Sequence, residues 1–174
     1  VLTLDNVTVR GRNARENLHS VSLQVHANEI VGIAGVSGNG QAALAALVSG
    51  LGVPDAGKLI VGTNEITRPE PGLMIRSGVG RIPEDRHHDG VVGAMSVAEN
   101  LIIEQLDAPE FQRGGFLRRD AIAHNATRLS ATYDIRGPGT DAPARLLSGG
   151  NIQKLILARV FECAPQLILA NQPT

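Results

Sequence analysis

Residues 147–155 read LSGGNIQKL, and this stretch decides how the chain is interpreted. Ser148, Gly149 and Gly150 stand directly before an apolar-periodic segment at 152–160, which predicts a helix. The first N–H groups of a helix have no partner within it, and the helix dipole places partial positive charge at the same end. A serine and two glycines at this end therefore predict either a helix cap or a binding site for an anion such as a phosphate group.

A second glycine-rich stretch, GVSGNGQA, occupies residues 35–42. The spacing of Gly35 and Gly40 fits the phosphate-binding P-loop pattern G-x-x-x-x-G-K-[ST]. Gln41 stands where that pattern has Lys, and Ala42 stands where it has Ser or Thr. The frame of a phosphate site is therefore kept, while its charged and metal-binding side chains are absent.

The order of predicted elements indicates an α/β protein with a helical insertion. Residues 2–9 and 18–25 alternate apolar and polar, as half-buried antiparallel edge strands do, whereas 30–34 is uniformly apolar and predicts a strand buried on both faces. Further strands are predicted at 58–61, 78–83 and 166–170, and helices at 41–49, 71–77, from a Ser96–Glu99 capping box onward, at 120–133 and at 152–160. We expect an α/β core at 1–83 and 155–174 and a helical subdomain at 84–154.

The string LSGGN followed by Gln153 closely resembles the signature motif of the nucleotide-binding domains of ATP-binding cassette (ABC) transporters. The order along the whole chain is also similar to that family: a P-loop-like turn, a proline–acid turn at 83–86, helices, the signature, and an apolar strand that ends in NQPT at 171–174. The resemblance implies a P-loop NTPase-type cassette with an antiparallel β edge and a helical signature subdomain. It also implies a fragment that stops after the Walker B strand, which ends in Asp-Glu-Pro-Thr in the family.

The departures from the family pattern point to a subfamily. PEDR at 83–86, with Glu84 in place of the Q-loop glutamine, resembles the second cassette of importers for simple sugars and nucleosides, which carry two cassettes on one polypeptide. GNGQ and the Gln-Pro-Thr ending resemble the nucleoside branch more than the sugar branch. We expect Asp85 and Arg86 to pair with each other or to contact a transmembrane partner.

The substituted positions have chemical consequences for the phosphate site that the resemblance implies. Gln41 donates only a neutral hydrogen bond, and charge-assisted bonds are about twice as strong. Ala42 has no oxygen for Mg²⁺, Asn171 offers a carbonyl oxygen without charge, and Gln172 cannot act as a general base. We therefore expect weak ATP binding, a doubtful role for Mg²⁺, no assigned catalytic residue, and little or no hydrolysis by the domain alone. The backbone cradle assigns to the nucleotide site Gly35, Val36, Ser37, Gly38, Asn39, Gly40, Gln41, Ala42 and Ala43.

The intact signature implies a role toward a partner. In the family two cassettes dimerise head to tail, and each ATP lies between the P-loop of one and the signature of the other. The resemblance therefore implies that this chain offers its signature to the γ-phosphate held by a second cassette. The signature residues are Leu147, Ser148, Gly149, Gly150, Asn151 and Gln153. Permease subunits, an indirect link to a substrate-binding protein, and a peripheral place on the cytoplasmic face of the inner or plasma membrane are implied as well.

Composition narrows the remaining classes of function. The net charge is −1, no basic run occurs and aromatic residues make up 2% of the chain, which argues against a nucleic-acid surface. No apolar run approaches the ~18 residues of a membrane span. His87 and His88 lack further ligands at metal-binding spacing, so no metal site is predicted there. An autonomous ATPase with substituted catalytic groups, and an interaction module without nucleotide, stay open as alternatives.

Overall fold

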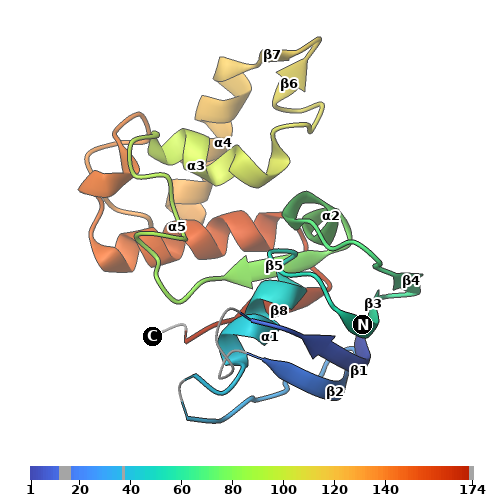
Figure 1. Cartoon of the computed structure of the whole chain (residues 1–174). Coiled ribbons are helices and arrows are strands. Elements are labelled where there is room, and N and C mark those ends of the chain that lie inside the picture. The colour runs from blue at the N-terminus through green and yellow to red at the C-terminus, as the bar shows by residue number, and fades with distance from the viewer. Residues whose placement is uncertain (12–16, 37, 173–174) are drawn as a thin grey trace. The chain divides into compact units, whose positions relative to one another are not determined.

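The computed structural model describes residues 1–11, 17–36 and 38–172. Its contacts divide the chain into two compact units, one formed by residues 1–81 and 165–169 and the other by 82–164 and 170–174 (Figure 1). Each unit has its own cluster of buried apolar side chains. The expected functional division, with a helical subdomain at 84–154, places its boundaries at other residues and stays a prediction.

The first unit is built on an antiparallel sheet with strand order β2–β1–β3–β4. Leu4 lies opposite Leu23 on one side and Leu59 on the other, and both Leu4 and Leu59 are buried. This arrangement confirms the antiparallel edge expected from the alternating pattern. The strands are β1 (Leu2–Val9), β2 (Leu18–Val25), β3 (Ala56–Val61) and β4 (Asn64–Glu65).

Two helices complete the core of this unit, α1 (Gln41–Val48) and α2 (Pro71–Arg76). Leu47 of α1 and Met74 of α2 are buried in the same cluster as the strand residues. Gly50 follows α1 at a φ of 77°, and a Cβ there would lie 2.5 Å from the backbone carbonyl carbon of Glu70. Only glycine tolerates both the left-handed backbone and this close approach.

A second, two-stranded sheet pairs β5 (Val79–Ile82) with β8 (Leu167–Ala170). The N–H of Leu167 donates to Gly78 at 3.1 Å and the N–H of Asn171 donates to Ile82 at 3.0 Å. The pairing advances in the same direction along both segments, so the strands are parallel. Both strands were expected from their apolar runs.

The predicted buried strand at 30–34 is wrong. These residues adopt no strand, and Ile30 and Ile33 are 99% and 54% exposed. A strand needs a neighbour that accepts its backbone hydrogen bonds, and neither sheet of this unit includes the run. The apolar pattern indicates that these residues favour burial, but it does not indicate which strand would pair with them.

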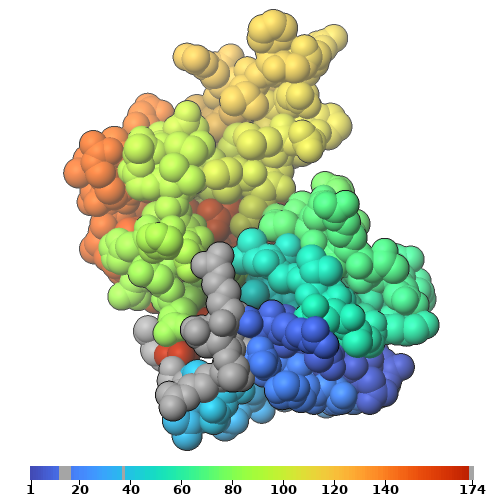
Figure 2. All heavy atoms as spheres, in the orientation of Figure 1, coloured from blue at the N-terminus to red at the C-terminus, as the bar shows by residue number. Residues whose placement is uncertain are grey.

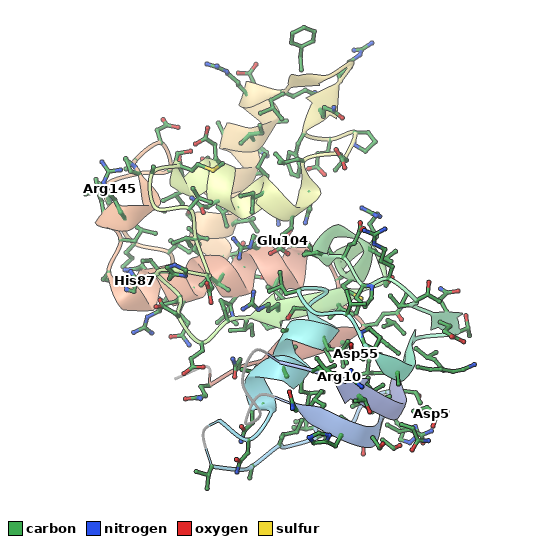
Figure 3. The ribbon with its side chains drawn as sticks, in the orientation of Figure 1. Asp5, Arg10, Asp55, His87, Glu104 and Arg145 are labelled. Carbon is green, nitrogen blue, oxygen red and sulfur yellow. The ribbon has the colours of Figure 1, made fainter. Side chains whose placement is uncertain are left out.

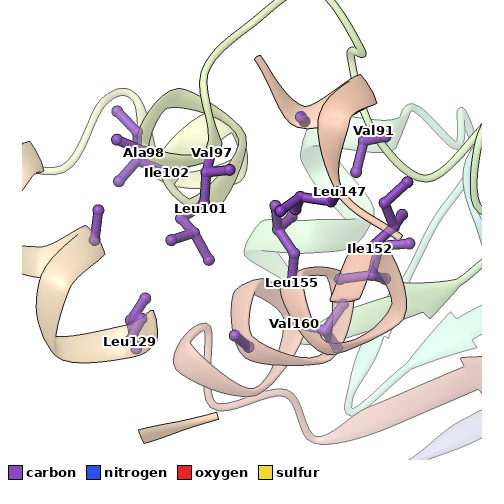
Figure 4. Packing of buried hydrophobic residues seen from close by; sticks show 14 of the residues in the cluster. Val91, Val97, Ala98, Leu101, Ile102, Leu129, Leu147, Ile152, Leu155 and Val160 are labelled. Carbon is purple, nitrogen blue, oxygen red and sulfur yellow. The ribbon is translucent and has the colours of Figure 1, made fainter. Parts of the chain in front are cut away.

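The second unit is helical. Its helices are α3 (Val97–Ile102), the 3₁₀ turn η2 (Ile103–Gln105), α4 (Arg119–Thr132), the 3₁₀ turn η3 (Ala144–Leu146) and α5 (Gly149–Glu162). Leu101, Leu129, Ile152 and Leu155 meet in one buried cluster (Figure 4). The predicted capping box is confirmed, because the Ser96 hydroxyl accepts from the N–H of Glu99 while the Glu99 carboxylate accepts from the N–H of Ser96.

The sequence patterns did not predict the short strand β4, nor the hairpin of β6 (Gln112–Arg113) and β7 (Phe116–Leu117). Gly114 and Gly115 join the strands with φ values of 59° and 85°. A two-residue loop with positive φ at both positions is the turn that suits the twist of a hairpin. The hairpin stands out from the helices of its unit, in yellow in Figure 2.

Candidate functional site

The glycine-rich turn before α1 has the backbone that its sequence predicts. Gly38 and Gly40 have φ values of 89° and 92°, and Gly40 immediately precedes the first residue of the helix. A Cβ on Gly40 would lie 3.0 Å from the side chain of Leu18, so space as well as conformation requires glycine. Ala42 is exposed and Ala43 is half-buried in the first turn of α1, whereas Ser37 lies outside the described residues.

The side chain of Gln41 folds back over this turn. Its Nε2 donates to the carbonyl of Val36 at 3.1 Å, and its Oε1 accepts from the N–H of Asn39 at 3.1 Å. The same Nε2 lies 2.5 Å from where a Cβ on Gly35 would be, so Gly35 leaves the room that the amide occupies. One of the backbone donors expected to cradle a phosphate is therefore already bonded within the chain.

At the end of β8, the substituted pair Asn171 and Gln172 lies beside the proline–acid turn. The Nδ2 of Asn171 lies 3.5 Å from the carboxylate of Glu84, the upper limit of hydrogen-bond length. A shallow depression brings together three predicted site residues, Glu84, Gln153 and Gln172. It is lined by Ile82, Pro83, Glu84, Arg86, Gln153, Ile156 and Gln172. The last two residues of the NQPT ending, 173 and 174, lie outside the described part of the chain.

The signature segment starts α5, and Ser148 is its N-cap residue in extended conformation. The Ser148 side chain makes no capping hydrogen bond to the helix backbone, so a side-chain helix cap, one of the two predicted roles, is wrong. Its Oγ instead accepts from the Nδ2 of Asn151 at 2.9 Å, and the residue is exposed. The hydroxyl and the first N–H groups of α5 are thereby left for another acceptor.

The two signature glycines differ in what surrounds them. A Cβ on Gly149 would lie 3.2 Å from the guanidinium nitrogens of Arg86, whereas a Cβ on Gly150 would meet nothing within 4 Å. Gly149 therefore makes room for a side chain of its own chain. The space next to Gly150 is open.

Arg86 reaches the signature helix rather than its sequence neighbour. Its Nη1 donates to the Oε1 of Gln153 at 3.2 Å, in addition to its approach to Gly149. Asp85 accepts the N–H groups of His87 and His88, both at 2.9 Å, and these bonds hold the pKa of its carboxyl below the ordinary value. The expected Asp85–Arg86 pair is therefore wrong, and the sequence carried no signal for the contact across 67 positions.

Buried Arg159 of α5 contacts both the turn after PEDR and η2. The Nη2 of Arg159 donates to the carbonyl of Gly90 at 2.9 Å. Its Nε lies 2.9 Å from the carboxylate of Glu104, without hydrogen-bond alignment. Glu104 is labelled in Figure 3. The side chain of Arg159 is only 7% exposed. Burial lowers the pKa of Arg159, and the charge of Glu104 opposes that shift. Helix α5 and the PEDR turn are thus tied through several polar contacts.

A family model with the description ABC transporter matches residues 18–174. The chain belongs to the ABC transporter family. The α/β cassette fold is confirmed, and the assignment of LSGGN as the signature stays a prediction.

Three curated relatives are ATP-binding proteins of importers. The chain is 38% identical over 174 residues to the nucleoside import ATP-binding protein NupA of Lactococcus lactis, covering all of this chain and 34% of NupA. It is 38% identical over 174 residues to the guanosine import protein NupO of Bacillus subtilis, covering all of this chain and 34% of NupO. It is 42% identical over 176 residues to the glucose import protein TsgD13 of Haloferax volcanii, covering all of this chain and 32% of TsgD13. The chain thus spans about a third of the length of these relatives.

Solved structures confirm the fold. The dimeric ATP-binding cassette MJ0796 in a post-hydrolysis state with ADP and Pi matches with a TM-score of 0.77 at 21% identity, covering all of this chain and 75% of that one. A nucleotide-free cassette matches with a TM-score of 0.72 at 22% identity, covering all of this chain and 69% of that one. Among the described residues, no helix has the length and apolar character that a membrane crossing needs.

Proposed function

We propose that this chain is a nucleotide-binding domain of an importer for simple sugars or nucleosides, and that its signature completes the ATP site of a partner cassette. The observation that carries the proposal is the N-terminus of α5. There Ser148 is exposed and does not cap the helix, and the space beside Gly150 is open. Helix N-termini of this kind bind phosphate groups through backbone N–H donors and the helix dipole.

The chain's own P-loop serves as the weak half of the pair. The Gln41 amide occupies the Asn39 N–H, so a phosphate has to displace it before the turn can close around the ligand. Ala42 supplies no oxygen for Mg²⁺, and the pair Asn171 and Gln172 supplies neither a charged ligand nor a general base. ATP is therefore bound weakly at this turn, with little use of Mg²⁺, and hydrolysis depends on the partner's catalytic groups.

The partners follow from the same proposal. The second cassette lies on the same polypeptide or on another chain, and this domain resembles the second cassette of a two-cassette protein. Transmembrane permease subunits hold the pair at the cytoplasmic face of the membrane, and a substrate-binding protein delivers the solute to them. NupA and NupO are named for nucleosides and TsgD13 for glucose, which supports this solute class. Within this solute class, GNGQ in the P-loop favours the nucleoside importers over the sugar importers.

The test compares Ser148→Arg with Gln41→Ala in the complete two-cassette protein, assembled with its permease. Ser148→Arg places a bulky cation in the space for the partner's γ-phosphate, and we expect ATPase activity to fall by about 100-fold. Gln41→Ala changes only the weak half and is expected to leave activity within about twofold, because a side chain that bonds only within its own turn contributes little. Thermal unfolding of both variants checks that they fold.

Two outcomes would contradict the proposal. Full activity of Ser148→Arg would exclude a role of the signature in a partner site. Equal losses in the two variants would mean that the P-loop of this chain is a working half-site, as in an autonomous ATPase. ATP titration of both variants separates that case from a module that does not bind nucleotide.

A further inference from the structure

We infer that Asn151 is a positioning residue that turns the Ser148 hydroxyl outward as a hydrogen-bond donor to the phosphate. The inference rests on the proposed function, because it assigns a role to a neighbour of the signature serine. It concerns residues of one compact unit only. The orientation of the Asn151 amide determines which way the Ser148 hydroxyl points.

The backbone of Arg136 determines that orientation. The N–H of Arg136 donates to the Oδ1 of Asn151 at 2.8 Å. A backbone N–H can only donate, so the atom that faces it has to be the amide oxygen. The other atom of the amide is therefore the Nδ2, and it faces the Oγ of Ser148 at 2.9 Å.

The direction of the Ser148 hydroxyl follows from this. An amide NH₂ group has no acceptor lone pair, so the Asn151–Ser148 bond uses a lone pair of Oγ and leaves the hydroxyl proton free. The helix backbone does not use that hydroxyl as a cap. Because Ser148 is exposed at the start of α5, its proton is available to an anion beside the first N–H groups of the helix.

A small charged network holds Arg136 in place. Asp134 accepts from the Nε of Arg136 at 2.8 Å and from the Nζ of Lys154 at 2.8 Å, and its backbone carbonyl accepts from the same Nζ at 2.7 Å. The bonds from Lys154 and then Arg136 lower the pKa of Asp134, so its carboxylate stays ionised. The loop after α4 is thus fastened to α5 at Asn151 and at Lys154. The network joins two cations and one anion, which suits a neighbouring phosphate.

The experiment uses Asn151→Asp and Asn151→Ala in the complete two-cassette protein with its permease. Aspartate has the same shape and still accepts a hydrogen bond from the N–H of Arg136. Its second oxygen also accepts a hydrogen bond from the Ser148 hydroxyl, which turns that hydroxyl inward. Alanine loses the Arg136 contact and leaves the hydroxyl free to rotate. We expect kcat to fall by about 100-fold for Asn151→Asp and by less for Asn151→Ala. In both variants KM should change less than kcat does. A residue that only fastened the loop would give the opposite order, because aspartate keeps that contact.

Ser148→Ala completes the test as a double-mutant cycle. If Asn151 acts through the hydroxyl, Asn151→Asp adds no loss in kcat to Ser148→Ala. Losses that multiply would show that the aspartate charge repels the phosphate directly, and would overturn the inference. If Ser148→Ala and Ser148→Arg both keep full activity, the proposed function itself fails. If Ser148→Ala lowers kcat while both Asn151 variants keep full activity, only the inference about Asn151 fails.

Discussion

The P-loop-like turn at 35–43 and the signature-like segment at 147–154 are built alike but differ in which polar groups are free. Each places glycines at the N-terminus of a helix. In the first, the Gln41 amide bonds to both the Val36 carbonyl and the Asn39 N–H, so one backbone donor of the turn is already occupied. In the second, Ser148 is left uncapped and Gly150 faces open space. The same local architecture therefore has one donor occupied by its own chain in the first region and an uncapped helix start in the second.

The surroundings of the two regions differ as well. The signature helix is held from within by buried Arg159, which contacts Gly90 and Glu104. The run at 30–36 that leads into the P-loop turn is exposed, with Val36 at 76%. Four predictions test this contrast in how firmly each region is held and in which of its polar groups are free to bind a ligand.

Breaking the anchor of the signature helix is expected to have the largest effect. Arg159→Met leaves Glu104 in a largely buried site without its counter-charge, and removing one partner of a buried pair costs about 3–5 kcal/mol. Urea unfolding of this chain, followed by helical circular dichroism, measures the loss. In the double variant Arg159→Met with Glu104→Met most of the stability should return, because an apolar pair removes both buried charges. Gln41→Ala serves as the comparison from the other region, and an equal loss there would remove the contrast.

Adding a side chain at Gly150 should lower activity without lowering stability. Gly150→Ala is expected to lower ATPase activity of the complete two-cassette protein by about 100-fold, because the added methyl group fills the space beside the helix N-terminus. The fold should not suffer, since alanine favours a helix over glycine by roughly 1 kcal/mol. Steady-state ATPase and thermal unfolding are measured together. Gly72→Ala in α2 is the matched control, and normal activity in Gly150→Ala would mean that no ligand approaches this glycine.

The P-loop turn should respond weakly to both mutation and metal. Calorimetric titration of ATP into this chain is expected to give affinities within about threefold with and without Mg²⁺, because Ala42 offers no oxygen ligand. Gln41→Ala frees the Asn39 N–H and is expected to change the affinity by no more than about twofold, since one neutral bond is exchanged for another. A gain of tenfold or more with Mg²⁺ would show that another group in this half binds the metal.

Acid should weaken the network beside the signature by a small amount. The pKa of Asp134 lies below its ordinary value of 3.8, first because Lys154 and then because Arg136 donates to it. A lowered pKa in the folded state means that the ionised carboxylate stabilises the fold above the ordinary value and that this contribution is lost as the pH falls below it. Thermal unfolding midpoints of the natural chain and of Asp134→Asn should therefore differ at pH 7 and converge below about pH 4. If the difference in unfolding midpoint stayed constant across this range, the effect of Asp134 on stability would not come from its charge.

Local patterns were enough for most of the elements. Alternation predicted β1 and β2, helical periodicity predicted α1, α4 and α5, and the Ser96–Glu99 spacing predicted its capping box. These features depend on residues within one or two turns of each other, so their physical cause is contained in a short stretch of chain. The same holds for the turn at Gly38 and Gly40, where positive φ favours glycine.

The strand expected at 30–34 marks the limit of such reasoning. Its composition favours burial, but a strand forms only when a neighbouring strand accepts its backbone hydrogen bonds. The residues of the run do not indicate which segment that neighbour would be. The hairpin at 112–117 was missed for a different reason. Its strands are two residues each, too short to show a period, although the Gly114–Gly115 pair is a turn signal.

For the candidate site, the sequence by itself determined the inventory. It named the glycines of both turns, the absence of Lys, Ser and the two acids, and the signature serine, because a motif is a set of residue types at fixed spacing. Tertiary structure alone decided which of those groups are free. Gln41 closes on its own turn, Arg86 reaches Gln153 across 67 positions, and Asn151 is oriented by the backbone of Arg136. Hydrogen bonds act over about 3 Å in space and are independent of separation along the chain, so only the folded arrangement determines them.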